Sequence, residues 1–425
     1  MSPFDRIIGY RSIRKELERT ADALKNTEKY SRLGASAPRG LLLWGDPGVG
    51  KTLMAVCLIE ASGRKHFTCR KNQPDGDFVN GIRRVFEQAI KEAPSIVFLD
   101  DMDKFANNDE DHKDSEEYVT VQSCIDAAKD SEVFVLATAN RIDDLPDSLI
   151  RVGRFDRCVR VTTPTGQDAV EIIRHYLSSK SFVSDIDPED VAGFMAGFSC
   201  AELETAVNKA GLLAGYEGCE TINARHLILG CLDIAQRISP DSILTEKSGE
   251  KRGELMQLAA YHEAGHAVVC EALFPGTVSA ICLYESLGRV SGLTAHREIV
   301  AHDLQSQLLE AIIPFGGRAA TRLVFGCSDV GSVKDLEHVK MILDSHITKN
   351  GALGFNLLDS FFENSQERMR LQEEAISAKM EACAQEAERL VAANRGLLTA
   401  IANELMKKGL LVSEDIRRLK QSVCS

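Results

Sequence analysis

The sequence predicts an α/β domain, a parallel sheet with flanking helices, that is followed by a helical lid and then by a mainly α-helical domain. Three observations support this fold class. Short apolar runs alternate with helical spacing over about 40–161, the pattern of a parallel sheet wrapped by helices. No strand pattern follows over about 164–235, where the apolar spacing is helical. A polar run over 246–253 then separates these segments from the C-terminal part.

Five strands are expected in the α/β part, over 40–44, 66–69, 95–99, 133–138 and 157–161. Farther along, we expect an apolar helix at about 261–272, a strand at 278–284 and a long helix at 366–393. The apolar positions of that last helix do not sustain a heptad, which favours bundle packing over a coiled coil. The predicted domains are 1–162 (α/β), 163–238 (lid), 239–253 (linker) and 254–425.

Composition excludes some classes of protein. The 425 residues include 50 Lys and Arg against 63 Asp and Glu, a formal net charge of −13, so no nucleic-acid partner is expected. No stretch reaches the ~18 apolar residues of a membrane span, and the first residues lack an apolar signal core. The 12 cysteines form no CxxC pair, which is typical of reduced thiols. We therefore expect a soluble, cytoplasmic chain with no membrane span.

A glycine-rich segment follows the first expected strand. Gly45-Asp46-Pro47-Gly48-Val49-Gly50-Lys51-Thr52 fits GxxxxGK[ST] and leads into a helical run. Glycines let backbone N–H groups surround phosphate oxygens, Lys51 supplies a positive charge, and Thr52 offers a hydroxyl to Mg²⁺. A purely structural turn is the alternative, which this strand-to-helix context disfavours. The motif predicts a site for ATP and Mg²⁺.

Polar side chains follow two further strands of the expected sheet. Asp100 and Asp101 come directly after the strand at 95–99. The first carboxylate can hold Mg²⁺ through water, and the second can orient or deprotonate the attacking water. Asn140 follows the strand at 133–138 and would place an amide beside the γ-phosphate. An Asn in this position is usually a turn residue, but its occurrence in series with the other two elements favours a catalytic role.

The apolar helix expected at 261–272 contains the motif HExxH. His262 and His266 would lie on one helical face, where two imidazoles can bind one Zn²⁺ while Glu263 points at its open position. Zinc lowers the pKa of bound water to about 7, and Glu263 can accept the proton. A single histidine here would more often be a core residue, but the pair favours a metal. A third protein ligand is needed, and spacing alone leaves several open: Asp329, Asp335, Glu337 and His338.

The segment 4–234 resembles an AAA ATPase module, because 149–157 is similar to the second region of homology of that superfamily. The resemblance implies that Arg151 and Arg154 are arginine fingers that reach the nucleotide of a neighbouring subunit in a homohexameric ring. Such a guanidinium can contribute ~10³- to 10⁵-fold in rate. Surface salt bridging is the alternative for either arginine. The resemblance also implies adenine contacts at Ile8 and His175.

The C-terminal part resembles the FtsH family of AAA metalloproteases, through HEAGH, the segment Gly-Gly-Arg-Ala-Ala at 316–320 and Val-Lys-Asp-Leu at 333–336. The resemblance implies that Asp335 is the third ligand of one Zn²⁺ per subunit. It also implies an ATP-dependent zinc metalloprotease that acts on unfolded or tagged protein substrates. The strand at 278–284 would then be an edge strand on which a substrate lies extended.

Three features depart from that family. Asp101 stands where the family has Glu, so we expect slow ATP hydrolysis. The segment 71–84 is shorter than the family's pore loop, with 78–81 as the remnant of its pattern. Family members carry transmembrane helices before the ATPase module, so we expect an unanchored variant, which Met1 favours, or a member without its anchor. These departures leave two alternatives: a remodelling ATPase with little proteolysis, or a nucleotide-gated scaffold.

Overall fold

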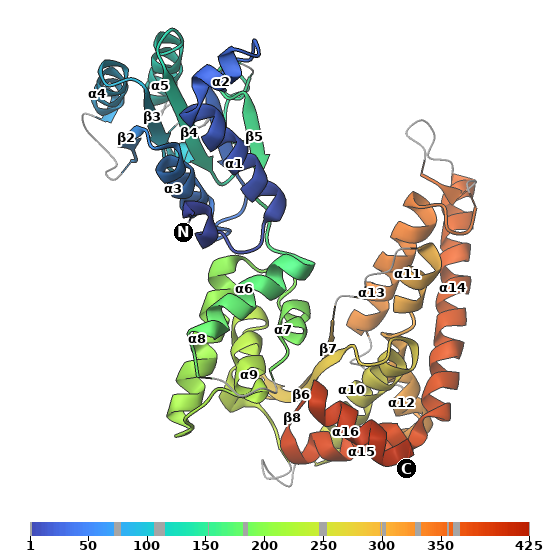
Figure 1. The fold of residues 1–425 in the computed structure, drawn as a ribbon. Coiled ribbons are helices and arrows are strands. Elements are labelled where there is room, and N and C mark those ends of the chain that lie inside the picture. Colours follow the sequence, from blue (N-terminus) through green and yellow to red (C-terminus); the bar gives the residue numbers. More distant parts are fainter. Residues whose placement is uncertain are drawn as a thin grey trace. The chain divides into compact units, whose positions relative to one another are not determined.

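The computed structural model describes residues 2–71, 78–105, 115–151, 153–181, 186–245, 253–297, 299, 303–327, 333–354, 357–359 and 366–424. Its contacts divide the chain into two compact units. One contains Met1–His175 and Gly197–Glu204, and the other contains Tyr176–Ala196 and Thr205–Ser425. Figure 1 draws the elements of both units. The finer division into sheet, lid, linker and C-terminal domain stays a prediction.

The first unit contains a parallel sheet of five strands, in the order β2-β3-β4-β1-β5. The strands are β1 (Gly40–Trp44), β2 (Lys65–Cys69), β3 (Ser95–Leu99), β4 (Val133–Ala139) and β5 (Arg157–Arg160). Each expected strand is confirmed to within one residue at either end. Every residue of β3 and β4 is buried, which is why these strands are continuous apolar runs in the sequence.

Helices flank this sheet, as Figure 1 shows. They are η1 (Pro3–Arg6), α1 (Arg11–Lys25), α2 (Thr27–Ser31), α3 (Lys51–Ser62), α4 (Phe78–Lys91), η2 (Met102–Lys104) and α5 (Ser115–Ala127). The buried side of α4 packs with α5 on the core of the sheet through Ile82 and Phe86. Because the strands are parallel, the segments that follow β1, β3 and β4 meet at one edge of the sheet.

The predicted lid is helical, and its helices are α6 (Gly166–Ser178), α7 (Pro188–Phe194), α8 (Cys200–Tyr216) and α9 (Ala224–Ala235). The last residues of α6, α7, most of α8 and α9 belong to the second unit, where α7 and α9 contact a small sheet. A 3₁₀ turn, η3 (Pro240–Ser242), follows α9.

That small sheet has three antiparallel strands in the order β7-β6-β8: β6 (Val278–Ser286), β7 (Arg289–His296) and β8 (Leu410–Val412). The prediction of an edge strand at 278–284 is therefore wrong, since β6 lies between two partners. The first six residues of β6 are buried, whereas most of β7 is half-buried. Strand β7 is the edge strand beside the HExxH helix.

The rest of the second unit is helical: α10 (Gly253–Leu273), α11 (Leu304–Glu310), α12 (Phe315–Phe325), α13 (Val333–Asp344), a π-helical turn η7 (Ser345–Lys349), α14 (Gln366–Ala393), α15 (Arg395–Lys408) and α16 (Ser413–Cys424). Helix α10 is central, because α12, α14, α15 and the sheet all pack on it (Figure 1). Helix α14 packs against α10, α12 and α13, which confirms bundle packing. Within the described residues, no helix is both long and apolar enough to cross a membrane.

Candidate functional site

The glycine-rich segment connects β1 to α3, as the motif predicted. Gly45, Gly48 and Gly50 have φ angles of 146°, 79° and 94°, and Gly50 is the N-cap of α3. A Cβ atom on Gly45 would lie 1.9 Å from the carbonyl oxygen of Val161, so the close approach requires glycine. The N–H of Ala201, in the first turn of α8, donates to the carbonyl of Gly48 at 3.1 Å. A loop of this conformation at a helix N-terminus can bind phosphate.

Lys51, Thr52, Asp100 and Asn140 converge at this edge of the sheet. The Lys51 Nζ atom donates to two carbonyl oxygens of the loop, at 2.7 and 2.8 Å, and to Asn140 Oδ1 at 3.0 Å. Thr52 Oγ1 donates to Asp100 Oδ1 at 3.2 Å. Burial lowers the pKa of Lys51, although the aspartates around it oppose that shift. The structure thus brings together four of the residues singled out in the sequence.

Two residues that sequence reasoning missed hold these groups in place. Thr138 Oγ1 donates to Asp100 Oδ1 at 2.9 Å and accepts from the N–H of Asp101 at 2.9 Å. Asp103 Oδ2 accepts from Asn140 Nδ2 at 3.1 Å. A hydroxyl inside the otherwise apolar run of β4 was the available signal for Thr138, since a buried hydroxyl needs a partner.

Asp101 has a left-handed backbone, with φ 55° and ψ 50°. Its Oδ2 atom lies 2.7 Å from Lys104 Nζ and 3.5 Å from a guanidinium nitrogen of Arg70. Two cations of the same chain therefore hold the carboxylate that was predicted to activate water. Its ion pairs fit the expectation of slow hydrolysis, which stays a prediction.

The predicted adenine-side residues lie in the first unit as well. Ile8 is half-buried and His175 is exposed on α6. Directly after Ile8, a Cβ on Gly9 would lie 3.1 Å from the Cβ of Asp168 in α6, and the Tyr10 hydroxyl donates to the carbonyl oxygen of Thr162 at 2.9 Å. These contacts hold the N-terminal segment against the start of α6. Roles for Ile8 and His175 in binding adenine stay predictions.

The two arginines of the second region of homology have different surroundings. Arg151 is exposed, whereas Arg154 is only 2% exposed. Its guanidinium lies 2.6 and 3.0 Å from the two carboxylate oxygens of Asp126 and also donates to Ser148 O. Arg154 and then Lys129 hold the pKa of Asp126 well below its usual value. Arg154 is therefore paired within its own subunit, and its role as an arginine finger stays a prediction. The role of Arg151 stays a prediction.

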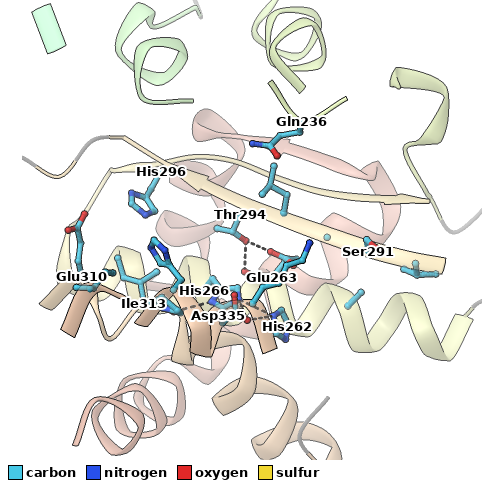
Figure 2. Close-up of a pocket in the computed structure, with 18 residues that line it drawn as sticks. Gln236, His262, Glu263, His266, Ser291, Thr294, His296, Glu310, Ile313 and Asp335 are labelled. Atoms are coloured by element: carbon cyan, nitrogen blue, oxygen red, sulfur yellow. Dashed lines mark hydrogen bonds and ion pairs between the residues drawn. The ribbon is translucent and has the colours of Figure 1, made fainter. Parts of the chain in front are cut away.

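The HExxH motif lies on α10, and its histidines meet an aspartate from α13. The Nε2 atoms of His262 and His266 are 3.0 Å apart. Asp335 Oδ2 lies 3.2 Å from the first and 3.6 Å from the second (Figure 2). Among the described residues that spacing left open, Asp335 joins the two histidines. His338 lines the same cleft, and Asp329 lies outside the described residues.

These three side chains fit a zinc ion. Zinc bonds of about 2.0–2.1 Å in a tetrahedral site place two ligand atoms about 3.3 Å apart. The observed separations of 3.0–3.6 Å bracket that value. Asp335 Oδ2 is buried, and among the described residues its near polar neighbours are the two histidines, a donor set that suits a cation. Burial alone would raise the pKa of Asp335, but His262 and His266 outweigh it and hold the pKa below its usual range.

The loop before α12 and the start of that helix orient the histidines. His266 Nδ1 lies 3.0 Å from the carbonyl oxygen of Ile313, and a proton donated there leaves the Nε2 lone pair for a metal. A Cβ on Gly317 would lie 2.5 Å from Cε1 and Nε2 of His262, and a Cβ on Gly265 would lie 2.2 Å from Gly316 O. The two glycines of α12, read in the sequence only as a family marker, therefore let α12 approach the ligands.

Glu263 faces a cleft of about 770 Å³ that is lined by α10, β7 and α13. The side chain is buried, with 7% exposure, and its Oε2 atom accepts from Thr294 Oγ1 of β7 at 2.7 Å. Figure 2 shows Glu263 between the metal ligands and the strand that carries Thr294. This arrangement can hold a metal, a base and an extended chain side by side.

The fold and both sites define a class of protein, an AAA ATPase joined to a zinc peptidase domain. Residues 41–163 match the family described as "ATPase family associated with various cellular activities (AAA)", and residues 251–419 match "Peptidase family M41". The chain is 30% identical over 454 residues to an ATP-dependent zinc metalloprotease FtsH of Caldicellulosiruptor bescii, covering 98% of this chain and 71% of that relative. The chain belongs to the FtsH family of ATP-dependent zinc metalloproteases, which implies zinc and ATP as cofactors.

Two further relatives carry the same name. The protein of Leptotrichia buccalis is 31% identical over 382 residues, which cover 86% of this chain and 48% of the relative. That of Synechococcus sp. is 29% identical over 458 residues, which cover 98% of this chain and 69% of the relative. The chain thus spans from about half to seven tenths of the length of these relatives.

Proposed function

We propose that this chain unfolds and degrades proteins, and that ATP hydrolysis drives polypeptide to the cleft where peptide bonds are hydrolysed. The observation that carries the proposal is the convergence of His262, His266 and Asp335 beside Glu263 in an open cleft. A phosphate-binding loop on the same chain supplies the ATP dependence. Unfolded or tagged proteins are the proposed substrates, and a homohexameric ring is the proposed assembly.

In the cleft, His262, His266 and Asp335 would hold Zn²⁺, which when bound polarises the peptide carbonyl and activates a water molecule. Glu263 would accept the proton of that water and pass it to the leaving amine. Strand β7 pairs with β6 along one side. The other side of β7 would pair with the backbone of an extended substrate, a recognition mode that is indifferent to sequence.

At the sheet edge, Lys51 would bind the β- and γ-phosphates, and Thr52 and Asp100 would hold Mg²⁺. Asn140 would position the attacking water, and Arg151 would reach the nucleotide of a neighbouring subunit. Ion pairs with Lys104 and Arg70 compete for the Asp101 carboxylate, so ATP hydrolysis would be slow.

Degradation of a loosely folded protein tests the proposal. Cleavage is expected with ATP and is expected to disappear with a chelator or in Glu263→Gln. Glu254→Gln is the matched control, because this exposed glutamate lies on the same helix outside the cleft. Cleavage by Glu263→Gln at the wild-type rate would refute the mechanism.

A nucleotide-gated scaffold is the second candidate, and the ion pairs of Asp101 favour it. Steady-state ATP turnover distinguishes the two. A chain that binds ATP but does not hydrolyse it, even as Asp101→Glu, would be a scaffold. Measurable turnover by the wild-type chain would exclude that candidate.

A further inference from the structure

The face of β7 that is turned toward α10 contacts Glu263 at two places. Gly292 and Thr294 are two residues apart, so they lie on the same face of the strand. Thr294 Oγ1 lies 2.7 Å from Oε2 and 3.0 Å from the carbonyl oxygen of Glu263. A Cβ atom on Gly292 would lie 2.3 Å from Cγ and 2.6 Å from Oε1 of the same glutamate. Thr294 thus binds the carboxylate of Glu263, and Gly292 leaves the space that this carboxylate occupies.

We propose that Thr294 and Gly292 are positioning residues that fix the Glu263 carboxylate for its role as the general base. This inference rests on the proposed peptidase function and names two residues that this function requires. The Thr294 hydroxyl holds Oε2, and among the described residues no hydrogen bond engages Oε1. Oε1 is therefore the oxygen that can accept a proton from water.

The need for positioning follows from the chemistry of a general base. A base must lie within about 2.6–3.2 Å of the proton donor, and a glutamate side chain has several rotatable bonds. A hydrogen bond from a strand that is itself paired to β6 reduces that freedom before substrate arrives. Because the same strand would pair with the substrate backbone, β7 would place substrate and base in one register.

The variants separate positioning from simple packing. Thr294→Val keeps the shape and removes the hydroxyl, and Thr294→Ser keeps the hydroxyl. Gly292→Ala adds the Cβ that would displace Glu263, at a residue whose φ is not in the left-handed region. Thr348→Val is the matched control, because this buried threonine of η7 donates to Asp344 O at 2.8 Å and lies outside the cleft.

Hydrolysis of a short unstructured fluorogenic peptide by the zinc-loaded full chain, with ATP present, gives kcat and KM. Loss of a group that orients a metal-site residue typically costs about 10- to 100-fold. We expect that loss in kcat for Thr294→Val and Gly292→Ala, with KM within about threefold of wild type. Thr294→Ser and Thr348→Val should keep wild-type kcat, and all four should bind one zinc.

Two results would overturn the inference. One is a wild-type kcat in Thr294→Val and Gly292→Ala. The other is a Thr294→Ser variant as slow as Thr294→Val, which would show that the hydroxyl group does not by itself position Glu263.

A second measurement does not depend on catalysis. In the zinc-free chain, a double-mutant cycle of Glu263→Ala and Thr294→Val should give melting-temperature changes that deviate from additivity by about 2–4 °C. Additive changes would contradict the contact. A wild-type chain that cleaves nothing would refute the proposed function, and the cycle would still report on the Thr294–Glu263 contact.

Discussion

Gly317→Ala should remove zinc from this protein without unfolding it. The added Cβ would lie 2.5 Å from Cε1 and Nε2 of His262, whereas ordinary contact begins at 3.4 Å. The imidazole must therefore move by about 0.9 Å. Zinc sites tolerate deviations of about 0.2 Å in their bond lengths, so a histidine displaced this far no longer binds the metal.

The expected loss of affinity follows from the number of ligands. The binding free energy of structural zinc is about 10–16 kcal/mol, which amounts to about 3 kcal/mol for each of four protein ligands. Each 1.4 kcal/mol is tenfold in affinity, so the dissociation constant should rise at least about 100-fold. The fold itself should persist. The group that must move is the end of a side chain, and Ala in a helix is favoured over Gly by about 1 kcal/mol.

The assay is zinc content by mass spectrometry after dialysis, together with competition against a chelating dye. Gly396→Ala is the matched control. Gly396 lies on α15, a helix that carries none of the three proposed ligands, and the added Cβ would meet Val423 of α16. Wild-type zinc affinity in Gly317→Ala would refute the reasoning, because it would show that α12 does not set the position of His262.

Two further predictions concern the first unit. The pKa of Asp126 is lowered by Arg154 and Lys129, so its ion pair stabilises the fold above about pH 4 and this stability is lost as pH falls through the lowered pKa. Asp126→Asn should therefore lower the free energy of unfolding in urea by about 1 kcal/mol at neutral pH, a small value because the carboxylate is 37% exposed. The difference between variant and wild type should shrink near pH 3, and a difference independent of pH would contradict this reasoning. Lys104→Ala should raise steady-state ATP turnover by about 1.5- to 5-fold, because it releases the Asp101 carboxylate from an exposed ion pair worth ~0.2–1 kcal/mol. Unchanged turnover would show that this ion pair does not restrain hydrolysis.

Much of the first unit could be predicted because its signals are local. Buried parallel strands are continuous apolar runs, so β3 and β4 are evident without their neighbours. Lys51 and Thr52 belong to one short motif, and Asp100 and Asn140 each follow a strand. Once the strands are parallel, topology alone brings these side chains to one edge of the sheet. The pairing of Arg154 with Asp126 could not be predicted, because the two residues are 28 apart in the chain and spacing does not show that contact.

The second partner of β6 could not be predicted from local pattern. Its partner β8 has three residues, too few to show a period, and lies far along the chain at Leu410–Val412. The apolar run of β6 was itself a signal of burial on both faces, which indicates a central strand. The edge strand β7 carries Gly292 and mixed small residues, so its strand pattern is weak.

The metal ligands on α10 lie close together in the sequence, whereas the residues that position them and the base lie far along the chain. His262 and His266 are separated by one helical turn, which any helix provides. The contacts that orient these ligands and the base span 47 residues from His266 to Ile313 and 31 residues from Glu263 to Thr294. A long-range contact depends on how α12 and β7 pack, and no periodicity in the sequence encodes that packing. Substitutions at Gly292 and Gly317 can therefore leave every residue of HExxH intact and still displace the base or the metal ligand, so an intact motif is necessary for this chemistry but is not sufficient.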